Sequence, residues 1–372
     1  MTVATRRRFL AAAAGLGLTL VGARRLHAET ATGCLYANCV MTREGSYAVA
    51  VFDDAGAIRA LHPLPGRGHD VAFEPGRGLC VAFARRPGTF AVAFDLVGAR
   101  APEVIAAAPG RHFFGHGVFT PDGALLYATE NDFAAGRGVV GVYDVRDGWR
   151  RIGEMPTGGI GPHELVWTEP GRTLAVANGG VDTTPEAGGR TALNIADMEA
   201  SLTLVDVGAG RVVSTHRLGA DLAQLSPRHL AVDGRGAVWF GSQHFGDPTE
   251  LPPLAGRLVP GREPELFALP EEDAPRAKNY VGSVAVTADG GTAVFSAPKG
   301  SLVFAFDTAA GAFLGTAAVS DGCGLAPAPG HDAAVFVSAG TGRIGCWHPG
   351  GADYAPIAGE ALAFDNHLVR LV

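Results

Sequence analysis

The sequence is poor in charged residues, aromatic residues and cysteines. Charged residues make up 18% of the 372 positions, aromatic residues 8%, and there are five cysteines. The cysteine count is odd, and Cys34 and Cys39 are five positions apart on one expected strand. Their side chains should therefore point to opposite faces, which argues against a disulfide bond between them.

Several motifs that are typical of known enzymes or cofactor-binding proteins are also missing. The chain has no Gly-x-Ser-x-Gly elbow, no Walker loop, no Cys-x-x-Cys-His haem attachment site and no His-Glu-x-x-His pair. The formal net charge of −7 argues against binding to nucleic acid or to anionic lipid. After residue 23 no segment is long and apolar enough to cross a bilayer, so no membrane insertion is expected after the N-terminus is removed.

The N-terminus has the pattern of an export signal. "TRRRFL" (5–10) matches the twin-arginine motif, an apolar stretch follows at 11–23, and "LHA" (26–28) is a plausible cleavage site. We therefore expect a signal peptide at 1–28 and a single mature domain at 29–372 in the periplasm. The twin-arginine route carries folded proteins, often with a cofactor already loaded.

What the chain does contain is glycine, proline and short apolar runs. There are 53 glycines and 24 prolines, and no long stretch keeps a 3.6-residue apolar period. Short runs between Gly, Pro, Asp and Asn indicate many short strands with tight turns. A unit of strand, turn and strand recurs at intervals of about 40 to 66 residues, as in "GHDVAFEPGRGLCVAF" and "GHGVFTPDGALLYATE". Such periods are typical of a β-propeller.

The two ends of the chain are expected to form one blade together. "HLVRLV" at the C-terminus supplies one inner strand, while 34–40, 47–53 and 57–63 supply the three other strands of the same blade. Pairing them would close the ring and remove its open edges. The sequence thus predicts an all-β fold, a closed seven-bladed β-propeller. A six-bladed or irregular β architecture is the alternative.

A histidine leads most of the repeats. The leading positions should lie at the rim of the central channel, and they are His69, His116, His163, His229, Ser283, Cys323 and His367. Neutral imidazole is the commonest ligand of zinc, copper, iron and nickel, so the five histidines and Cys323 are candidate metal ligands. Polar residues on the same face could complete a site for a ligand or cofactor: Arg85, Glu130, Asn178 and Gln243.

A structural role for the histidines is the alternative. Propellers of the WD-repeat kind also place Gly-His before the first strand, where the histidine bonds within its own blade; here the Trp-Asp pair of those repeats is missing. Residues 178–200 form an unusually long link on the same face. We expect this link to act as a lid over the channel mouth.

Several motifs resemble an exported bacterial family. "RHFFGHGVFTPDGALLYATENDFAAGRGVVGVYD", "GGIGPHEL", "RHLAVD", "YVGSVAVTADG" and "FDNHLV" resemble members of the family known as domain of unknown function 1513. The resemblance implies a periplasmic seven-bladed propeller encoded beside imelysin-like and di-haem peroxidase-like proteins. It thereby implies partners of those two kinds and a setting of iron acquisition, with iron or copper as the ion.

Three functions remain open. The first is a periplasmic protein that binds iron or copper, or a small ligand, through its histidine ring as an accessory to iron uptake. The second is a metal-dependent propeller enzyme, an oxidoreductase or lactonase-like protein, which only fold analogy supports. The third is a docking scaffold without a ligand. The histidine count favours the first two over the third.

Overall fold

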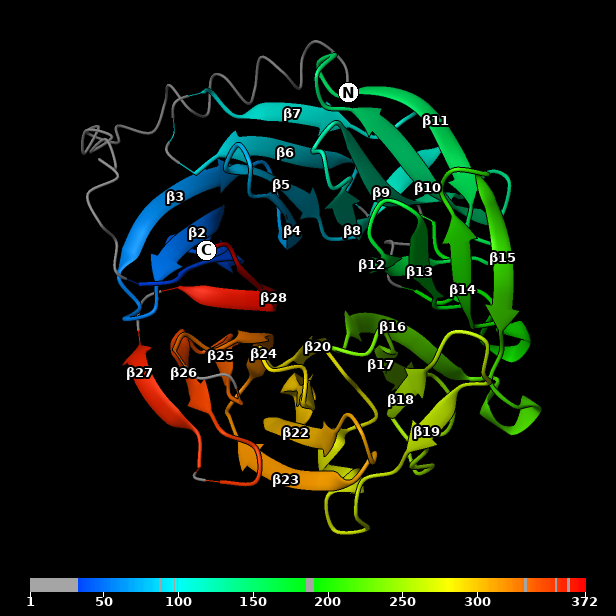
Figure 1. Ribbon diagram of the computed structural model, residues 1–372, viewed down its shortest axis with the longest axis vertical. Coiled ribbons are helices and arrows are strands. Elements are labelled where there is room, and N and C mark those ends of the chain that lie inside the picture. Colours follow the sequence, from blue (N-terminus) through cyan, green and yellow to red (C-terminus); the bar gives the residue numbers. More distant parts are fainter. Residues whose placement is uncertain are drawn as a thin grey trace.

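The computed structural model describes residues 33–372 except 87, 97, 99, 185–190, 331–332, 352 and 360–361. The expected signal peptide lies outside the described residues. The described chain forms seven four-stranded antiparallel sheets arranged as blades around a central axis (Figure 1). The predicted seven-bladed propeller is confirmed. No helix in the described part is long and apolar enough to cross a membrane.

Each blade contributes one strand to the wall of the channel. Neighbouring innermost strands contact one another all the way round the ring. They are β4 (Gly68–Glu74), β8 (Arg111–Phe119), β12 (Pro162–Glu169), β16 (Leu225–Val232), β20 (Ser283–Val286), β24 (Gly322–Pro327) and β28 (Ala363–Arg370).

The second and third strands form the buried middle of each blade. The second strands are β5 (Leu79–Ala84), β9 (Leu125–Asp132), β13 (Thr173–Asn178), β17 (Val238–His244), β21 (Thr292–Ala297), β25 (Val335–Ala339) and β1 (Leu35–Met41). The third strands are β6 (Phe90–Asp95), β10 (Arg137–Asp144), β14 (Ser201–Asp206), β18 (Ala255–Leu258), β22 (Leu302–Asp307), β26 (Arg343–Trp347) and β2 (Tyr47–Asp53).

The outermost strands are largely exposed. They are β7 (Glu103–Ala106), β11 (Arg150–Pro156), β15 (Arg211–His216), β19 (Glu265–Phe267), β23 (Phe313–Ala318), β27 (Ala355–Gly359) and β3 (Ile58–Leu64). Four short 3-10 helices lie in the links: η1 (Ile195–Asp197), η2 (Ala220–Leu222), η3 (Ala274–Ala277) and η4 (Pro298–Gly300).

The hydrophobic core lies between the blades. The middle strands are buried on both faces, as in β5, where all six residues are buried. Trp239 of one blade packs with Phe295 of the next, and Tyr36 of the closing blade packs with Phe336 of its neighbour. Because each blade is covered on both faces by its neighbours, the strands are continuously apolar rather than alternating.

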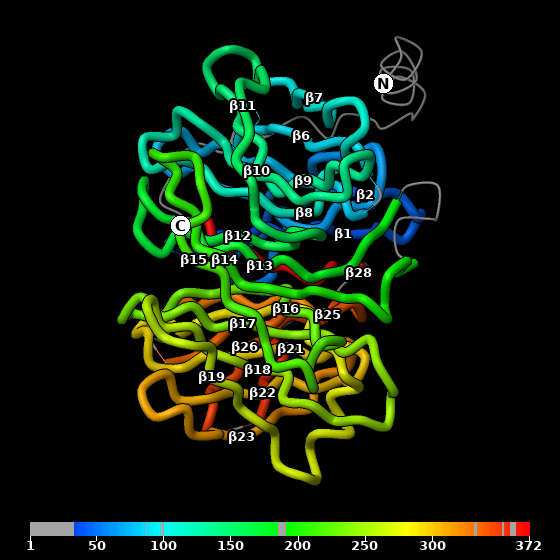
Figure 2. The backbone as a smooth tube through the Cα atoms, turned by 90° about the vertical axis from the view of Figure 1, so that its right-hand side faces the viewer, coloured from blue at the N-terminus to red at the C-terminus, as the bar shows by residue number. Residues whose placement is uncertain are grey.

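The ring closes as the sequence predicts. β28 pairs antiparallel with β1, so the last strand is the innermost member of the blade that the first three strands begin. In the side view of Figure 2 the blades from the first half of the chain, blue to green, lie above those from the second half, yellow to red. β28 joins the two halves and carries His367 into the channel wall.

Candidate metal centre

The five predicted histidines come together inside the channel. They lie on five consecutive innermost strands, and each is at least nine-tenths buried. The centroids of the rings in contact lie between 4.5 and 6.5 Å apart. We call this set the histidine cluster: His69, His116, His163, His229 and His367.

Irregular strand pairing helps to place these side chains. The register shifts between Gly68 and Val71 in β4, between Phe113 and Gly117 in β8, and between Pro162 and Leu165 in β12. A β-bulge of this kind bends the strand and re-aims a side chain. The register also shifts beside His229 in β16 and along β28.

Gly115 leaves the space that His69 occupies. Its φ is +109°, and a Cβ atom there would lie 2.4 Å from Cδ2 of His69. Any other residue would therefore meet both backbone strain and a clash with the imidazole. The glycine of the "GH" pair in β8 is thus required by the histidine of the preceding blade.

The donor atoms are close enough to share one or two ions. Two groups each have all their candidate donor atoms within 4.8 Å of one another: His69, His116 and His163, and a second group in which Glu164 joins His116, His229 and His367. Two nitrogens on opposite sides of an ion, each bound at ~2.1 Å, are ~4.2 Å apart. Small side-chain rotations would therefore bring either group to ligand distance.

Acidic side chains hold two of the imidazoles in place. Nδ1 of His116 is hydrogen-bonded to Oδ2 of Asp70 at 3.0 Å, and Nδ1 of His229 to Oε2 of Glu164 at 3.3 Å. In both rings Nε2 is buried and has no hydrogen-bond partner within the described part of the chain. A carboxylate on one ring nitrogen orients the other nitrogen for a metal ion and raises its basicity.

Burial keeps most of the cluster uncharged. Desolvation holds the pKa of His69, His163 and His229 well below the ordinary value, and it lowers the pKa of His367 to about 3. Uncharged imidazole is the form that binds metal. The cluster is therefore ready to ligate at neutral pH, apart from His116.

His116 and its two acidic neighbours behave differently. Burial disfavours the charged form of His116. Glu164 and Asp70 stabilise that charged form more strongly, so the pKa of His116 is raised. Burial also opposes the ionisation of Asp70, but His116 brings the pKa of Asp70 below its ordinary value. Burial raises the pKa of Glu164 to about 8. An ion bound here must displace protons from this corner of the cluster.

A cationic cavity lies on one side of the cluster. It has a volume of about 340 Å³. His69, His163 and His229 form part of its wall, and its other lining residues are Arg85, Arg86, Phe114, Arg228, Gln243, Phe245, Tyr280, Lys299 and Asn366. None of the described residues in this lining is acidic. We call this cavity the mouth pocket.

The cavity on the other side has the opposite character. Asp70, Glu164, Ser283 and His367 line it together with apolar residues of β20, β24 and β28, and Arg370 lies among its lining residues. We call it the acidic pocket. The histidine cluster thus separates a cationic cavity from an acidic one.

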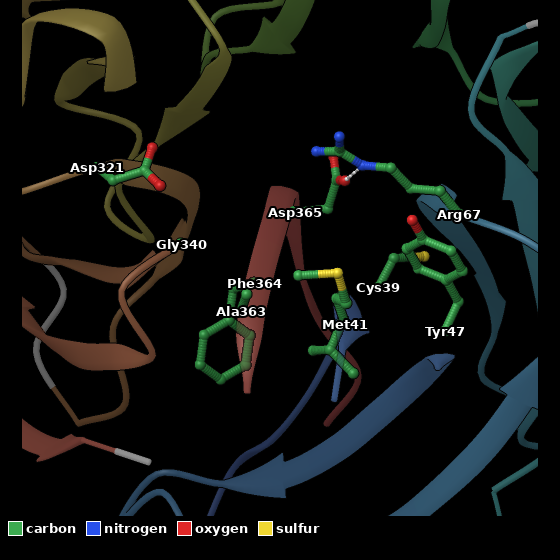
Figure 3. Close-up of a pocket in the computed structure, with 11 residues that line it drawn as sticks. Cys39, Met41, Tyr47, Arg67, Asp321, Gly340, Ala363, Phe364 and Asp365 are labelled. Carbon is green, nitrogen blue, oxygen red and sulfur yellow. Dashed lines mark hydrogen bonds and ion pairs between the residues drawn. The ribbon is translucent and has the colours of Figure 1, made fainter. Parts of the chain in front are cut away.

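Asp365 supports the mouth side without lining the mouth pocket. It pairs with Arg85 and with Arg67, and its Oδ1 lies 3.5 Å from Nδ1 of His69. Figure 3 shows the pair of Arg67 and Asp365 in a neighbouring cavity beside Cys39 and Tyr47. Asp365 therefore ties the closing strand β28 to the entry of β4.

Two of the four polar residues predicted around the site line the mouth pocket. Arg85 and Gln243 do so. Glu130 is fully buried inside its own blade, where it accepts hydrogen bonds from Tyr143 and Arg151. Asn178 donates to the carbonyl of Thr157 and is also fully buried. The structure thus places Glu130 and Asn178 away from both pockets, in contacts within and between the blades.

Cys323 does not join the histidines. Its Sγ donates to the carbonyl oxygen of Asp321 at 3.0 Å, and no group of potential metal ligands among the described residues includes it. Burial raises the pKa of its thiol, which disfavours the thiolate that a metal would need. Ser283, the other non-histidine at a leading position, faces the acidic pocket.

The long link is partly described. Val181 is buried, the carbonyl of Thr183 accepts a hydrogen bond from Asn131, and the side chain of Asn194 donates to the carbonyl of Gly180. Residues 185–190, the middle of the predicted lid, lie outside the described residues. The lid remains a prediction.

Sequence reasoning missed the charged neighbours of the histidines. Asp70 and Glu164 directly follow a cluster histidine, whereas Arg228 directly precedes one. Tyr280 comes from a link of the neighbouring blade. The charges beside each histidine were a usable signal in the sequence, but the contribution of Tyr280 depends on how the blades pack. The link 298–300, which carries Lys299, was expected on the channel face, and Lys299 lines the mouth pocket.

The family model described as "Protein of unknown function (DUF1513)" matches residues 62–371. The chain belongs to this family. No curated protein matches the sequence. The match spans all seven innermost strands from their beginning to their end, so the histidine cluster lies entirely within the family's domain.

Solved structures are similar in fold. Hydrazine synthase from Kuenenia stuttgartiensis has 12% identity and a TM-score of 0.62, with 83% of this chain and 94% of that chain covered. The Cps50 (Swd1) β-propeller domain of Myceliophteria thermophila has 12% identity and a TM-score of 0.58, with 84% and 96% covered. A functionally unknown protein from Desulfotomaculum acetoxidans has 13% identity and a TM-score of 0.56, with 90% and 98% covered. At these identities the likeness establishes the fold alone.

Proposed function

We propose that this propeller binds a transition-metal ion in its histidine cluster, with iron or copper as the ion in the cell. The observation that carries the proposal is the convergence of five buried imidazoles, with donor atoms of two overlapping groups within 4.8 Å. Imidazole-rich sites suit iron, copper, zinc and nickel.

The hydrogen bonding of the cluster supports binding over a purely structural role. The contacts of Asp70 with His116 and of Glu164 with His229 do connect neighbouring blades. They use only one nitrogen of each ring, however. Among the described residues no hydrogen-bond partner meets Nε2 of His69, His116, His229 or His367. Buried polar atoms without partners destabilise a fold by about 1–3 kcal/mol each, and a bound ion would compensate for this.

The cellular setting is part of the same proposal. The twin-arginine pattern at residues 5–10 supports export to the periplasm, with the ion loaded before or after transport. The family resemblance supports a role accessory to iron uptake, with imelysin-like and di-haem peroxidase-like proteins as partners. Binding and release of an ion need no reaction at the site, so this function requires no catalytic residue.

Calorimetric titration of the metal-free protein with Cu²⁺, Zn²⁺ and, without oxygen, Fe²⁺ at pH 7.5 tests the proposal. We expect at least one ion to bind the wild type and the affinity to fall at least tenfold in His116→Ala, since both donor groups share His116. The control is His216→Ala on the outer strand β15, which should bind as the wild type does. Absence of binding by all three ions, or equal binding by His116→Ala, would show that the cluster is structural.

A further inference from the structure

The mouth pocket concentrates positive charge in a protein that is acidic overall. Its lining includes the side chains of Arg85, Arg86, Arg228 and Lys299 and no carboxylate among the described residues. The whole chain has a formal net charge of −7. Arg85 is paired with Asp365, which lies outside the lining. A cationic cavity in an acidic protein attracts anions and raises their local concentration.

Arg228 is the most unusual of these cations. Its side chain is 1% exposed, and its Nε and Nη2 are buried without a hydrogen-bond partner in the described structure. Desolvation lowers its pKa to about 10, so it keeps its charge at neutral pH. A buried guanidinium with unused donors is costly to a fold unless something else accepts its hydrogen bonds.

Aromatic rings hold the cations in position. The guanidinium of Arg228 lies 5.2 Å from the ring centroid of Phe245, that of Arg86 lies 5.0 Å from Phe114, and Nζ of Lys299 lies 4.2 Å from Tyr280. A ring face attracts a cation but does not neutralise its charge. The rings of Phe245 and Tyr280 therefore orient Arg228 and Lys299 while leaving their charge available to a ligand.

We propose that the mouth pocket binds a small anion carrying two or more negative charges on oxygen, a phosphate or a di- or tricarboxylate. The fork of Arg228 would bind two oxygens of one oxyanion group, and Lys299 would pair with the remaining charge, on the same group in phosphate or on a second carboxylate. The proposal stands on the mouth pocket itself and does not require a metal ion. Since three cluster histidines share the cavity wall, such an anion would sit beside the proposed metal centre.

The multiple charge of the ligand follows from the number of cations. A monoanion would compensate only one of the positive groups that the aromatic rings hold. A ligand with two or three charges compensates more of them within one cavity of about 340 Å³. Because the pocket is partly buried, salt should weaken this attraction less than it weakens a surface contact.

The test is calorimetric titration of the metal-free protein with phosphate, succinate and citrate, each in Tris buffer at pH 7.5 and low ionic strength. Chelators must be removed beforehand by gel filtration, because they are polycarboxylates and would compete. Acetate is the singly charged comparison. We expect at least one multiply charged anion to bind with a Kd at least tenfold below that of acetate. Comparing the Kd of phosphate with the Kd values of succinate and citrate shows which kind of oxyanion the pocket prefers.

Three variants localise the binding. Arg228→Met keeps the buried volume and removes the unpaired charge, and Lys299→Met changes an exposed side chain, so both should fold. We expect each to weaken anion binding at least tenfold. Arg172→Met, at an arginine whose side chain is 75% exposed on another surface, is the control and should leave the affinity within twofold of the wild type.

Thermal unfolding provides a second readout. Without ligand, Arg228→Met should melt at or above the temperature of the wild type, because it loses a buried charge without a partner. With saturating anion, the melting temperature of the wild type should rise while that of Arg228→Met stays unchanged. The proposal is wrong if none of the three multiply charged anions binds the wild type, if acetate binds equally well, or if Arg228→Met binds them as the wild type does. If no anion binds but the metal ions bind normally, the anion proposal is wrong and the proposed metal site is unaffected.

Discussion

The two sides of the histidine cluster differ in the charged groups that line them. The mouth pocket, of about 340 Å³, is lined by Arg85, Arg86, Arg228 and Lys299. The acidic pocket, of about 390 Å³, is lined by Asp70 and Glu164 near the cluster. The imidazoles of the histidine cluster lie between the two pockets. The comparison shows that the channel has a direction, since the mouth side attracts anions through its cations, whereas the other side carries the carboxylate of Asp70, the carboxyl of Glu164 with its raised pKa, and Arg370.

The direction arises from how the innermost strands cross the channel. In β16, Arg228 faces the mouth and the next residue, His229, enters the cluster. In β12, His163 belongs to the cluster and the next residue, Glu164, faces the acidic pocket. Parallel strands of one ring bring equivalent positions to the same depth. Two side chains one position apart along a strand can therefore face opposite sides of the cluster.

Deleting residues 367–372 should break this arrangement most completely. β28 carries Asn366 in the mouth pocket, His367 in the cluster and Leu368 in the acidic pocket, and it pairs with β1. Without its end the closing blade exposes an edge and the channel loses part of its wall. We expect the cooperative unfolding transition to be lost or its midpoint to fall by well over ten degrees, as measured by circular dichroism.

Removing Val372 alone is the control for this deletion. Its side chain is 59% exposed and it lies beyond the end of β28. We expect a change of a few degrees at most. A protein that lacks residues 367–372 and melts like the wild type would show that closure does not depend on this strand.

Acid should destabilise the metal-free protein strongly. The pKa of His69, His163, His229 and His367 is lowered by burial, so below pH 6.5 the unfolded chain binds protons that the folded chain does not. Stability is therefore full above about pH 6.5 and falls as the pH decreases, by up to ~1.4 kcal/mol per pH unit for each such histidine.

His116 acts in the opposite sense, because its pKa is raised in the fold and its contribution is present at low pH and lost at high pH. Glu164 acts in the same sense as His116, because burial raises its pKa to about 8. Four histidines outweigh these two groups, so urea unfolding between pH 7.5 and 5.5 should show a net loss of stability. His229→Gln should reduce the pH slope, while His216→Gln should not. A flat profile would mean that the imidazoles are not buried as neutral groups.

Gly115→Ala should disturb the cluster from the side of a neighbouring blade. A Cβ atom would lie 2.4 Å from Cδ2 of His69, and φ at this position is +109°. We expect a loss of about 2 kcal/mol or more in unfolding free energy, and weaker metal binding. Gly315→Ala is a matched control, because its φ is +122° and nothing lies within 4 Å of the added atom. Equal effects of the two variants would attribute the loss to backbone strain alone.

The carboxylates of the acidic side should tune the metal centre without being essential to the fold. Asp70→Asn removes the carboxylate charge beside His116, and Glu164→Gln replaces the carboxyl beside His229 with an uncharged amide. Loss of such a partner typically weakens metal binding about 10- to 100-fold. Asp221→Asn, at an exposed acid in η2, is the control. Wild-type affinity in both Asp70→Asn and Glu164→Gln would show that the acidic side does not serve the cluster.

The blades and the positions of the five histidines could be predicted from the sequence. Which way the neighbouring polar side chains point could not. Periodicity identified the seven blades and the closure by residues 367–372. Four outer or third strands, β7, β18, β23 and β27, were not predicted, since short segments such as "EVIA" and "AGRL" carry little pattern. Glu130 and Asn178 were expected in links on the channel face, but Glu130 lies within β9 and Asn178 is the last residue of β13. Their buried side chains bond to Tyr143 and to Thr157 instead of facing the channel. That choice of face depends on packing that no local pattern encodes.

The smallest effect is expected at Cys323. It occupies a leading position as the histidines do, but its thiol donates to the carbonyl of Asp321, and burial keeps the pKa of the thiol above its ordinary value. Cys323→Ser preserves a donor at nearly the same place, so metal affinity should stay within twofold of the wild type. A tenfold loss would instead bring the sixth leading position into the metal centre. The cluster would then extend beyond the five consecutive strands that carry histidine, and the boundary between the two pockets would have to be redrawn to include β24.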